Sequence, residues 1–190
     1  MSNQLFPVFL KLDKLHTLVV GGGNVGLEKL EALLKNDPNA KVTLIAPFIR
    51  DEIREMAEDS STIRLIERKY ESSDLHRVDV AILATDDPEL HKEIRTEARG
   101  QNILLNVADT PDLCDFYLGS TVKRGDLKIG ISTNGKSPTF AKRFRQVLED
   151  ALPEETNHLL QNLKKIRDRL AGDFSFKIKE LNHITKSLIE

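Results

Sequence analysis

The chain has 190 residues, of which 39% are hydrophobic and 31% are charged. This composition is typical of a globular protein that buries its own core. Its 28 basic and 30 acidic side chains leave a net charge of −2, without the basic excess of a nucleic-acid-binding protein. The apolar runs are much shorter than the roughly 20 residues of a membrane span. A single cysteine, Cys114, favours a reducing compartment, so we expect a cytoplasmic protein. From the charge balance and the short apolar runs, we expect neither nucleic acid nor membrane as a partner.

Short apolar segments alternate with amphipathic ones over the first hundred residues. Strands are predicted at 15–20, 41–46, 63–67, 78–85 and 103–107, and helices at 25–35, 48–59 and 86–99. The segment 78–85 (VDVAILAT) suits a strand that is buried on both faces of a parallel sheet. The alternation predicts an α/β fold with a doubly wound parallel sheet of the Rossmann type.

The pattern changes after residue 110. Two further strands, at 116–123 and 127–133, are predicted to form a hairpin, and Ser137 followed by Pro138 predicts a helix that runs to residue 150. Helical spacing of apolar residues then predicts a tail at 155–170 and 174–189. The expected domains are a dinucleotide-binding domain at 1–113, a hairpin-and-helix module at 114–150 and a helical tail at 151–190. Because the middle module is small, we expect it to complete its core in a homodimer.

A glycine-rich motif, G-x-G-x-x-G, spans residues 21–26, directly after the first predicted strand and at the start of a helix. Gly21 allows a tight turn, Gly23 lets the backbone approach a pyrophosphate, and Gly26 lets helix and strand pack closely. The helix N-terminus offers N–H donors to phosphate groups. The motif predicts a dinucleotide site, and the alternative is a glycine-rich turn without a ligand.

The acidic residue that usually binds the cofactor ribose is missing from the end of the second predicted strand. That position reads Ala46-Pro47-Phe48, so the sequence alone does not confirm NAD. Arg50 suits the 2′-phosphate of NADP, but Asp51 beside it weakens that reading. We interpret Arg50 as a solvated helix residue.

Polar residues follow the fourth and fifth predicted strands, at the edge of a parallel sheet where ligands bind. Thr85, Asp86 and Asp87 follow the fourth strand, and Asn106 and Asp109 follow the fifth. Asp86 or Asp87 is expected to cap the next helix. Asp109 is expected either to cap the turn that follows it or to take the proton that accompanies hydride loss from a substrate.

A basic cluster surrounds the start of the helix predicted at Ser137. It consists of Lys136, Lys142, Arg143 and Arg145. One interpretation is a solvated helix face, and the other is a site for a small molecule with several carboxylates. The five histidines lack metal-ligand spacing, so no metal site is predicted.

In this order, the motifs resemble the precorrin-2 dehydrogenase family, which forms the dehydrogenase and ferrochelatase part of siroheme synthase. The segments that carry the resemblance are Leu5-Phe6-Pro7-Val8-Phe9-Leu10, Val20-Gly21-Gly22-Gly23-Asn24-Val25-Gly26 with Lys29, Ala84-Thr85-Asp86-Asp87, Asn106-Val107-Ala108-Asp109, Ile131-Ser132-Thr133-Asn134-Gly135 and Lys136-Ser137-Pro138. Two departures are Gly26, where many members carry alanine, and Glu28, where an arginine is frequent. The glycine is expected to be harmless.

The resemblance implies NAD-dependent oxidation of precorrin-2 to sirohydrochlorin by a homodimer, and in bifunctional members insertion of ferrous iron as well. It implies Asp109 as the catalytic residue. The implied cofactor-binding residues are Gly21, Gly22, Gly23, Asn24, Val25, Gly26, Ala46, Pro47, Phe48, Thr85, Asp86 and Asn106. The implied substrate-binding residues are Ser132, Thr133, Lys136, Ser137, Lys142, Arg143 and Arg145. The alternatives are a regulatory module that senses NAD or a nucleotide, and a small methyltransferase that uses S-adenosylmethionine.

Overall fold

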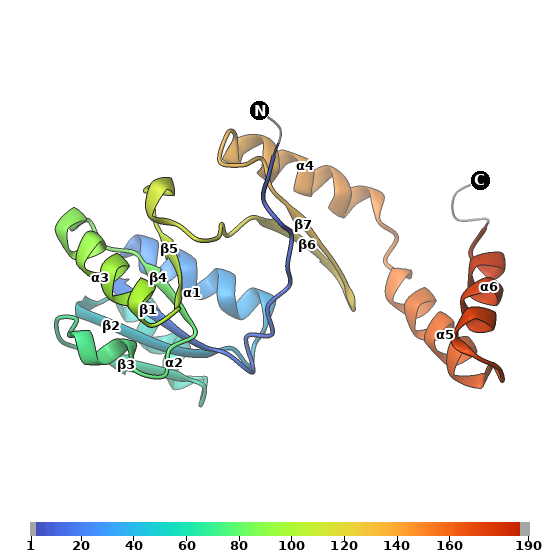
Figure 1. Cartoon of the computed structure of the whole chain (residues 1–190), viewed down its shortest axis with the longest axis horizontal. Helices are drawn as coiled ribbons and strands as arrows, with labels where there is room; N and C mark the ends of the chain where they lie inside the picture. Colours follow the sequence, from blue (N-terminus) through green and yellow to red (C-terminus); the bar gives the residue numbers. More distant parts are fainter. Residues whose placement is uncertain (1–2, 187–190) are drawn as a thin grey trace. The chain divides into compact units, whose positions relative to one another are not determined.

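The structure is a computed structural model that describes residues 3–186. The chain divides into two compact units, each of which is considered by itself (Figure 1). One unit spans Phe6–Leu118, and the other contains the described residues from Gly119 onward with those before Phe6. The functional division at 1–113, 114–150 and 151–190 stays a prediction.

The first unit is a five-stranded parallel sheet with helices on both faces, as the sequence predicts. Its elements are β1 (His16–Gly22), α1 (Asn24–Asn36), β2 (Lys41–Ile49), α2 (Asp51–Glu58), β3 (Ile63–Ile66), η1 (Ser72–Leu75), β4 (Val80–Leu83), α3 (Pro88–Gly100), β5 (Leu104–Val107) and η2 (Pro111–Leu113). The strand order is β3-β2-β1-β4-β5: the chain adds β2 and β3 on one side of β1 and then adds β4 and β5 on the other side. The winding of the chain, not the direction of the strands, therefore reverses between β1 and β4. Ligands of doubly wound folds bind at the carboxyl ends of the strands at such a point.

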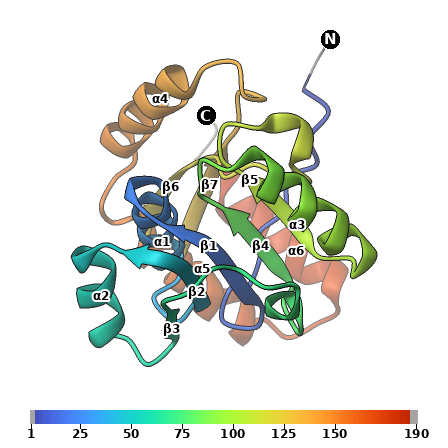
Figure 2. The same cartoon turned by 90° about the vertical axis from the view of Figure 1, so that its left-hand side faces the viewer.

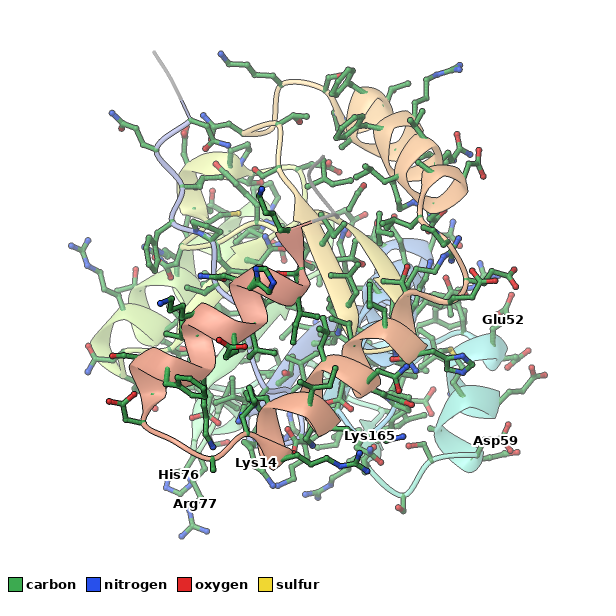
Figure 3. The ribbon with its side chains drawn as sticks, turned by 90° about the vertical axis from the view of Figure 1, so that its right-hand side faces the viewer. Lys14, Glu52, Asp59, His76, Arg77 and Lys165 are labelled. Carbon is green, nitrogen blue, oxygen red and sulfur yellow. The ribbon has the colours of Figure 1, made fainter. Side chains whose placement is uncertain are left out.

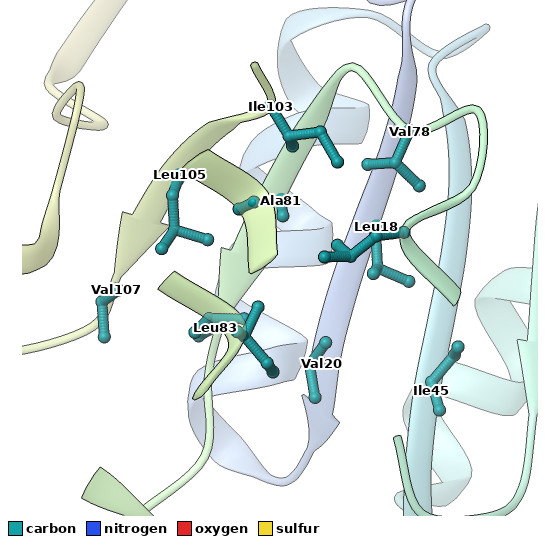
Figure 4. Close-up of a cluster of buried hydrophobic side chains, with 12 residues drawn as sticks. Leu18, Val20, Ile45, Val78, Ala81, Leu83, Ile103, Leu105 and Val107 are labelled. Carbon is teal, nitrogen blue, oxygen red and sulfur yellow. The ribbon is translucent and has the colours of Figure 1, made fainter. Parts of the chain in front are cut away.

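Alternate residues of each strand enter one of two hydrophobic clusters, one on each face of the sheet. Leu18 and Val20 of β1 pack with the α3 residues Ile94 and Ala98 (Figure 4). Val19, between them, packs on the opposite face with residues of α1 and α2. Figure 2 shows α1 and α2 on one side of the sheet and α3 on the other. The central strands are therefore buried on both faces, which explains their unbroken apolar sequence.

The second strand is longer than predicted. β2 runs to Ile49, because Val20 pairs with Ile45 and Gly22 pairs with Ile49, so three residues of β2 lie opposite one residue of β1. This bulge accommodates Ala46-Pro47-Phe48, and the N–H of Arg50 then bonds to the carbonyl oxygen of Gly22 at 3.1 Å. The prediction of a helix from residue 48 is therefore wrong in its first turn, and α2 begins at Asp51.

The second unit contains a hairpin and three helices. Its elements are β6 (Ser120–Arg124), β7 (Leu127–Ile131), α4 (Pro138–Ala151), α5 (Thr156–Arg169) and α6 (Phe174–Ile184). The strands are antiparallel, which confirms the predicted hairpin, and α4 packs on β6 through the buried Val122 and Ala141. The rings of Phe140 and Phe144 stack with their centroids 5.8 Å apart, and both side chains remain exposed. The predicted end of the last helix, 187–189, lies outside the described residues.

Candidate functional site

The glycine turn, residues 21–26, is closely surrounded by the ends of neighbouring strands. Gly21 has a φ of +121°, and a Cβ atom there would lie 2.3 Å from the carbonyl oxygen of Ala84, which follows β4. A Cβ on Gly22 would lie 2.3 Å from the carbonyl oxygen of Phe48 in β2. Side chains at these two positions would therefore separate the strands. The turn therefore requires glycine at these positions for steric reasons. The G-x-G-x-x-G spacing suggested this requirement, and the close approach of the strands explains it.

Gly23 and Gly26 have contrasting environments within the same turn. A Cβ on Gly26 would lie 2.1 Å from the carbonyl oxygen of Gly21, so helix α1 contacts the end of β1 directly. A Cβ on Gly23 would have no heavy atom within 4 Å. Gly23 is also the residue before α1, where free N–H groups and the positive end of the helix dipole favour phosphate. The open backbone at Gly23 fits the pyrophosphate of a dinucleotide.

The end of β2 places an aromatic ring and a cation close to the glycine turn. Phe48 is 67% exposed, although it lies in a strand of the central sheet. Arg50 donates to the Oδ1 atom of Asn24 and is also bonded to the carboxylate of Glu52. Arg50 is the residue before α2 and its side chain is paired but 34% exposed, so the expectation that it is solvated holds in part and its placement within the helix is wrong.

The end of β4 combines a structural cap with a pair of polar residues. Asp87 accepts hydrogen bonds at 3.1 Å from the N–H groups of Glu89 and Leu90, which confirms the predicted acidic cap. Asp86 is exposed and does not cap the helix. The Oγ1 atom of Thr85 lies 2.8 Å from the Nε2 atom of His91.

His91 is a residue of this edge that sequence reasoning missed. It is only 5% exposed, and burial lowers its pKa against the opposing effect of Asp87 and of the backbone of Thr85. A neutral imidazole therefore fixes the hydroxyl of Thr85. The signal was weak, because a lone histidine within a helix has no characteristic spacing.

Asn106 and Asp109, which were predicted together at the end of the fifth strand, have different environments. Asn106 is 6% exposed, and its Nδ2 atom donates to the carbonyl oxygen of Phe116 at 2.9 Å. Its amide group therefore holds the segment that leaves the sheet. Asp109 is exposed and has a φ of +57°. No hydrogen bond or ion pair engages its carboxylate anywhere in residues 3–186, so the carboxylate is unpaired within that range.

Four of the predicted substrate residues lie in the turn between β7 and α4, namely Ser132, Thr133, Lys136 and Ser137. Ser137 caps α4, because its Oγ atom accepts from the N–H of Phe140 at 3.1 Å. The Oγ1 atom of Thr133 accepts from the N–H of Ser137 at 3.2 Å. Ser132 accepts from the N–H of Asn134, also at 3.2 Å. These hydroxyl groups therefore fix the shape of the turn.

The basic cluster is only partly assembled. Lys142 and Arg143 line a shallow hollow on α4. Thr139, one helical turn before them, and Gln146, one helical turn after them, complete its lining. Arg145 is instead paired with Glu149 at 2.7 Å. Lys136 is exposed in the preceding turn. The cations that the structure leaves available at the hollow are Lys142 and Arg143.

A family model described as "Putative NAD(P)-binding" matches residues 8–120. The chain belongs to this family. A second model, described as sirohaem biosynthesis protein central, matches residues 124–151. The two models therefore cover the parallel sheet with its glycine turn and the region of the hairpin and α4.

Curated relatives are longer than this chain. The siroheme synthase of Pseudoalteromonas atlantica is 38% identical over 172 residues, which are 90% of this chain and 37% of the relative. That of Psychrobacter cryohalolentis is 39% identical over 176 residues, which are 93% of this chain and 32% of the relative. The chain thus spans about a third of the length of these relatives.

A solved structure resembles both units of the chain. "SirC, precorrin-2 dehydrogenase" has a TM-score of 0.73 and 27% sequence identity, and the match covers 95% of this chain and 89% of that one. Residues 3–186 contain no group of three or more His, Cys, Asp or Glu residues placed to hold a metal ion. Within the same range, no helix has the length and apolar character that crossing a membrane requires.

Proposed function

We propose that this protein oxidises precorrin-2 to sirohydrochlorin and passes the hydride to NAD. The observation that carries the proposal is the likeness to a precorrin-2 dehydrogenase over 95% of the chain, at a TM-score of 0.73. The glycine turn with its open backbone at Gly23 supports a dinucleotide as hydride acceptor. The similarity to siroheme synthases supports a role in siroheme biosynthesis.

The cofactor site consists of the glycine turn and the ends of β2, β4 and β5. Its residues are Gly21, Gly22, Gly23, Asn24, Val25, Gly26, Ala46, Pro47, Phe48, Thr85, Asp86 and Asn106. Bound NAD supplies a ring that accepts two electrons with one proton as hydride. The first turn of α1 binds the pyrophosphate, and the exposed ring of Phe48 offers an apolar surface. Asn106 acts indirectly, since its amide group is bonded to the backbone of Phe116.

Asp109 is the general base of the oxidation. Removal of two hydrogens from precorrin-2 delivers one as hydride to NAD and releases the other as a proton. The exposed carboxylate of Asp109, two residues beyond the end of β5, takes that proton. Such help is typically worth about 10²–10⁴-fold in rate.

The substrate site draws on the turn before α4 and on its first two turns. Precorrin-2 carries several carboxylates, and Lys136, Lys142 and Arg143 supply exposed cations that bind such groups. Arg145 contributes less, because Glu149 already neutralises it. Ser132, Thr133 and Ser137 shape the turn beside these cations.

Three finer features complete the proposal. The protein works as a homodimer, which would cover exposed apolar side chains such as Phe140 and Phe144. It acts in the cytoplasm, in line with its single unpaired cysteine. Ferrous iron is its second substrate: insertion into sirohydrochlorin releases two pyrrole protons, one of which a carboxylate such as Asp109 can accept while the other passes to solvent.

The decisive experiment mixes the purified protein anaerobically with precorrin-2 and NAD and follows sirohydrochlorin by absorbance, and then adds Fe²⁺. Oxidation that requires both protein and NAD supports the dehydrogenase. A protein-dependent conversion to siroheme supports the second activity, and iron insertion at the uncatalysed rate contradicts it. If NAD binds but no oxidation occurs, the protein is instead a module that senses the nucleotide.

A further inference from the structure

Arg50 connects the glycine turn to the first turn of α2. One nitrogen of its guanidinium donates to the side-chain oxygen of Asn24, the first residue of α1. Its Nε atom donates to the Oε2 atom of Glu52 at 3.1 Å, and its second terminal nitrogen bonds to the other carboxylate oxygen. Its backbone N–H bonds to the carbonyl oxygen of Gly22 at 3.1 Å. The Arg50–Glu52 pair is therefore anchored at the edge where β1 and β2 end.

This edge is where dinucleotide-binding folds hold the adenosine ribose. An acidic residue there binds the 2′-hydroxyl of NAD, whereas an arginine accommodates the 2′-phosphate of NADP. The present chain carries both kinds of residue, joined to one another. The acid lies later in the sequence than the usual position, because the bulge in β2 delays the end of that strand to Ile49.

The charge at this edge opposes a phosphate. Arg50 is one cation against the two carboxylates of Asp51 and Glu52. The hydrogen bond from Arg50 lowers the pKa of Glu52, so Glu52 is ionised at neutral pH. The Arg50 side chain is 34% exposed and that of Glu52 is 49% exposed, so a ligand can reach both. Figure 3 shows Glu52 at the surface on α2.

We propose that the Arg50–Glu52 pair makes this protein select NAD over NADP. Glu52 occupies the guanidinium that would otherwise bind a 2′-phosphate, and its own charge repels that phosphate. The inference rests on the proposed function only in taking a nicotinamide dinucleotide as the cofactor. It is tested by binding of the cofactor alone, so a failure of precorrin-2 oxidation leaves the result unaffected.

The test measures the Kd of NAD and of NADP by titration calorimetry on the full chain. We expect the wild-type protein to bind NAD more tightly than NADP. Glu52→Gln, which removes the charge and keeps the shape, should improve NADP binding relative to NAD by about tenfold. The double variant Glu52→Gln/Arg50→Gln should lose this gain, because the freed guanidinium is its source.

A matched control and the salt dependence separate this effect from a structural one. Glu55→Gln removes another exposed carboxylate of α2, one that forms no ion pair with any described residue, and should leave the ratio of the two Kd values unchanged. The gain in Glu52→Gln should shrink as ionic strength rises, since salt screens exposed charges. Equal wild-type affinities for NAD and NADP, or a Glu52→Gln variant with an unchanged ratio, would overturn the proposal.

Discussion

Gly26 and Gly21 approach each other so closely that a Cβ atom on Gly26 would lie 2.1 Å from the Gly21 carbonyl oxygen. Backbone atoms on both sides make the contact, so no flexible side chain can yield. The contact joins the first turn of α1 to the end of β1 and thereby sets the shape of the glycine turn. The expectation that glycine in place of alanine is harmless at position 26 can therefore be tested by exchanging the two residues.

Gly26→Ala should lower the free energy of unfolding by about 1–3 kcal/mol, the usual cost of forcing an extra methyl group into a packed site. It should also weaken NAD binding, because the turn must open to admit the methyl group. Urea denaturation and calorimetry provide the two measurements. Gly100→Ala is the matched control, since a Cβ on Gly100 of α3 has no neighbour within 4 Å. A Gly26→Ala protein as stable as the Gly100→Ala protein would show that the turn adjusts freely.

Asp109→Asn should lower kcat for precorrin-2 oxidation by about 10²–10⁴-fold and leave the Kd of NAD unchanged. Asparagine tolerates the left-handed backbone at this position, where φ is +57°, so the fold should be retained. Single-turnover absorbance measurements give the rate. Asp112→Asn, in η2, changes another exposed carboxylate nearby and should have wild-type turnover. Near-normal turnover in Asp109→Asn would remove this residue from the mechanism.

Replacing Lys142 and Arg143 together by glutamine should raise the KM for precorrin-2 by about 10-fold or more, because two cations that face the substrate carboxylates are lost. The affinity for NAD should not change. Arg145→Gln should have a smaller effect, since Glu149 already holds that guanidinium. Steady-state kinetics with precorrin-2 varied at saturating NAD distinguishes the two proteins. An equal KM for both would disprove a special role of the hollow on α4.

His91 should make the stability of the protein depend on pH. Burial holds the pKa of His91 below its ordinary value of 6.5, so below pH 6.5 the unfolded chain binds a proton more readily than the folded one. The free energy of unfolding should therefore fall as the pH decreases from 6.5 through the folded-state pKa, and it should be fully retained above 6.5. Urea denaturation between about pH 5 and about pH 8, the range in which histidine titrates, measures this pH dependence of the free energy of unfolding.

His91→Gln provides the comparison for that experiment. Glutamine keeps a hydrogen-bonding group near Thr85 but has no proton to gain in this range. Its free energy of unfolding should therefore decline less than that of the wild-type protein below pH 6.5. Identical pH profiles for the two proteins would mean that His91 does not titrate differently in the folded and unfolded states.

The sequence by itself determined the α/β architecture, because hydrophobic period and glycine spacing are local properties of a chain. The apolar segment 78–85 indicated a doubly buried strand, and the glycine turn was recognisable from its position after the first predicted strand. The caps Asp87 and Ser137 were predictable for the same reason, since a cap acts within one helical turn. The three-residue bulge of β2 was not predictable, because it depends on pairing with β1 across the sheet.

Only the tertiary structure decided which polar side chains remain available for chemistry. Asn106 and Asp109 looked alike in sequence, yet a hydrogen bond to the backbone of Phe116 engages the first, while the carboxylate of the second has no partner among residues 3–186. Arg50 was interpreted as solvated, but Glu52 and Asn24 hold it beside the glycine turn. Such partners come from strand pairing and helix packing, because hydrogen bonds between segments depend on distances in space rather than on spacing along the chain.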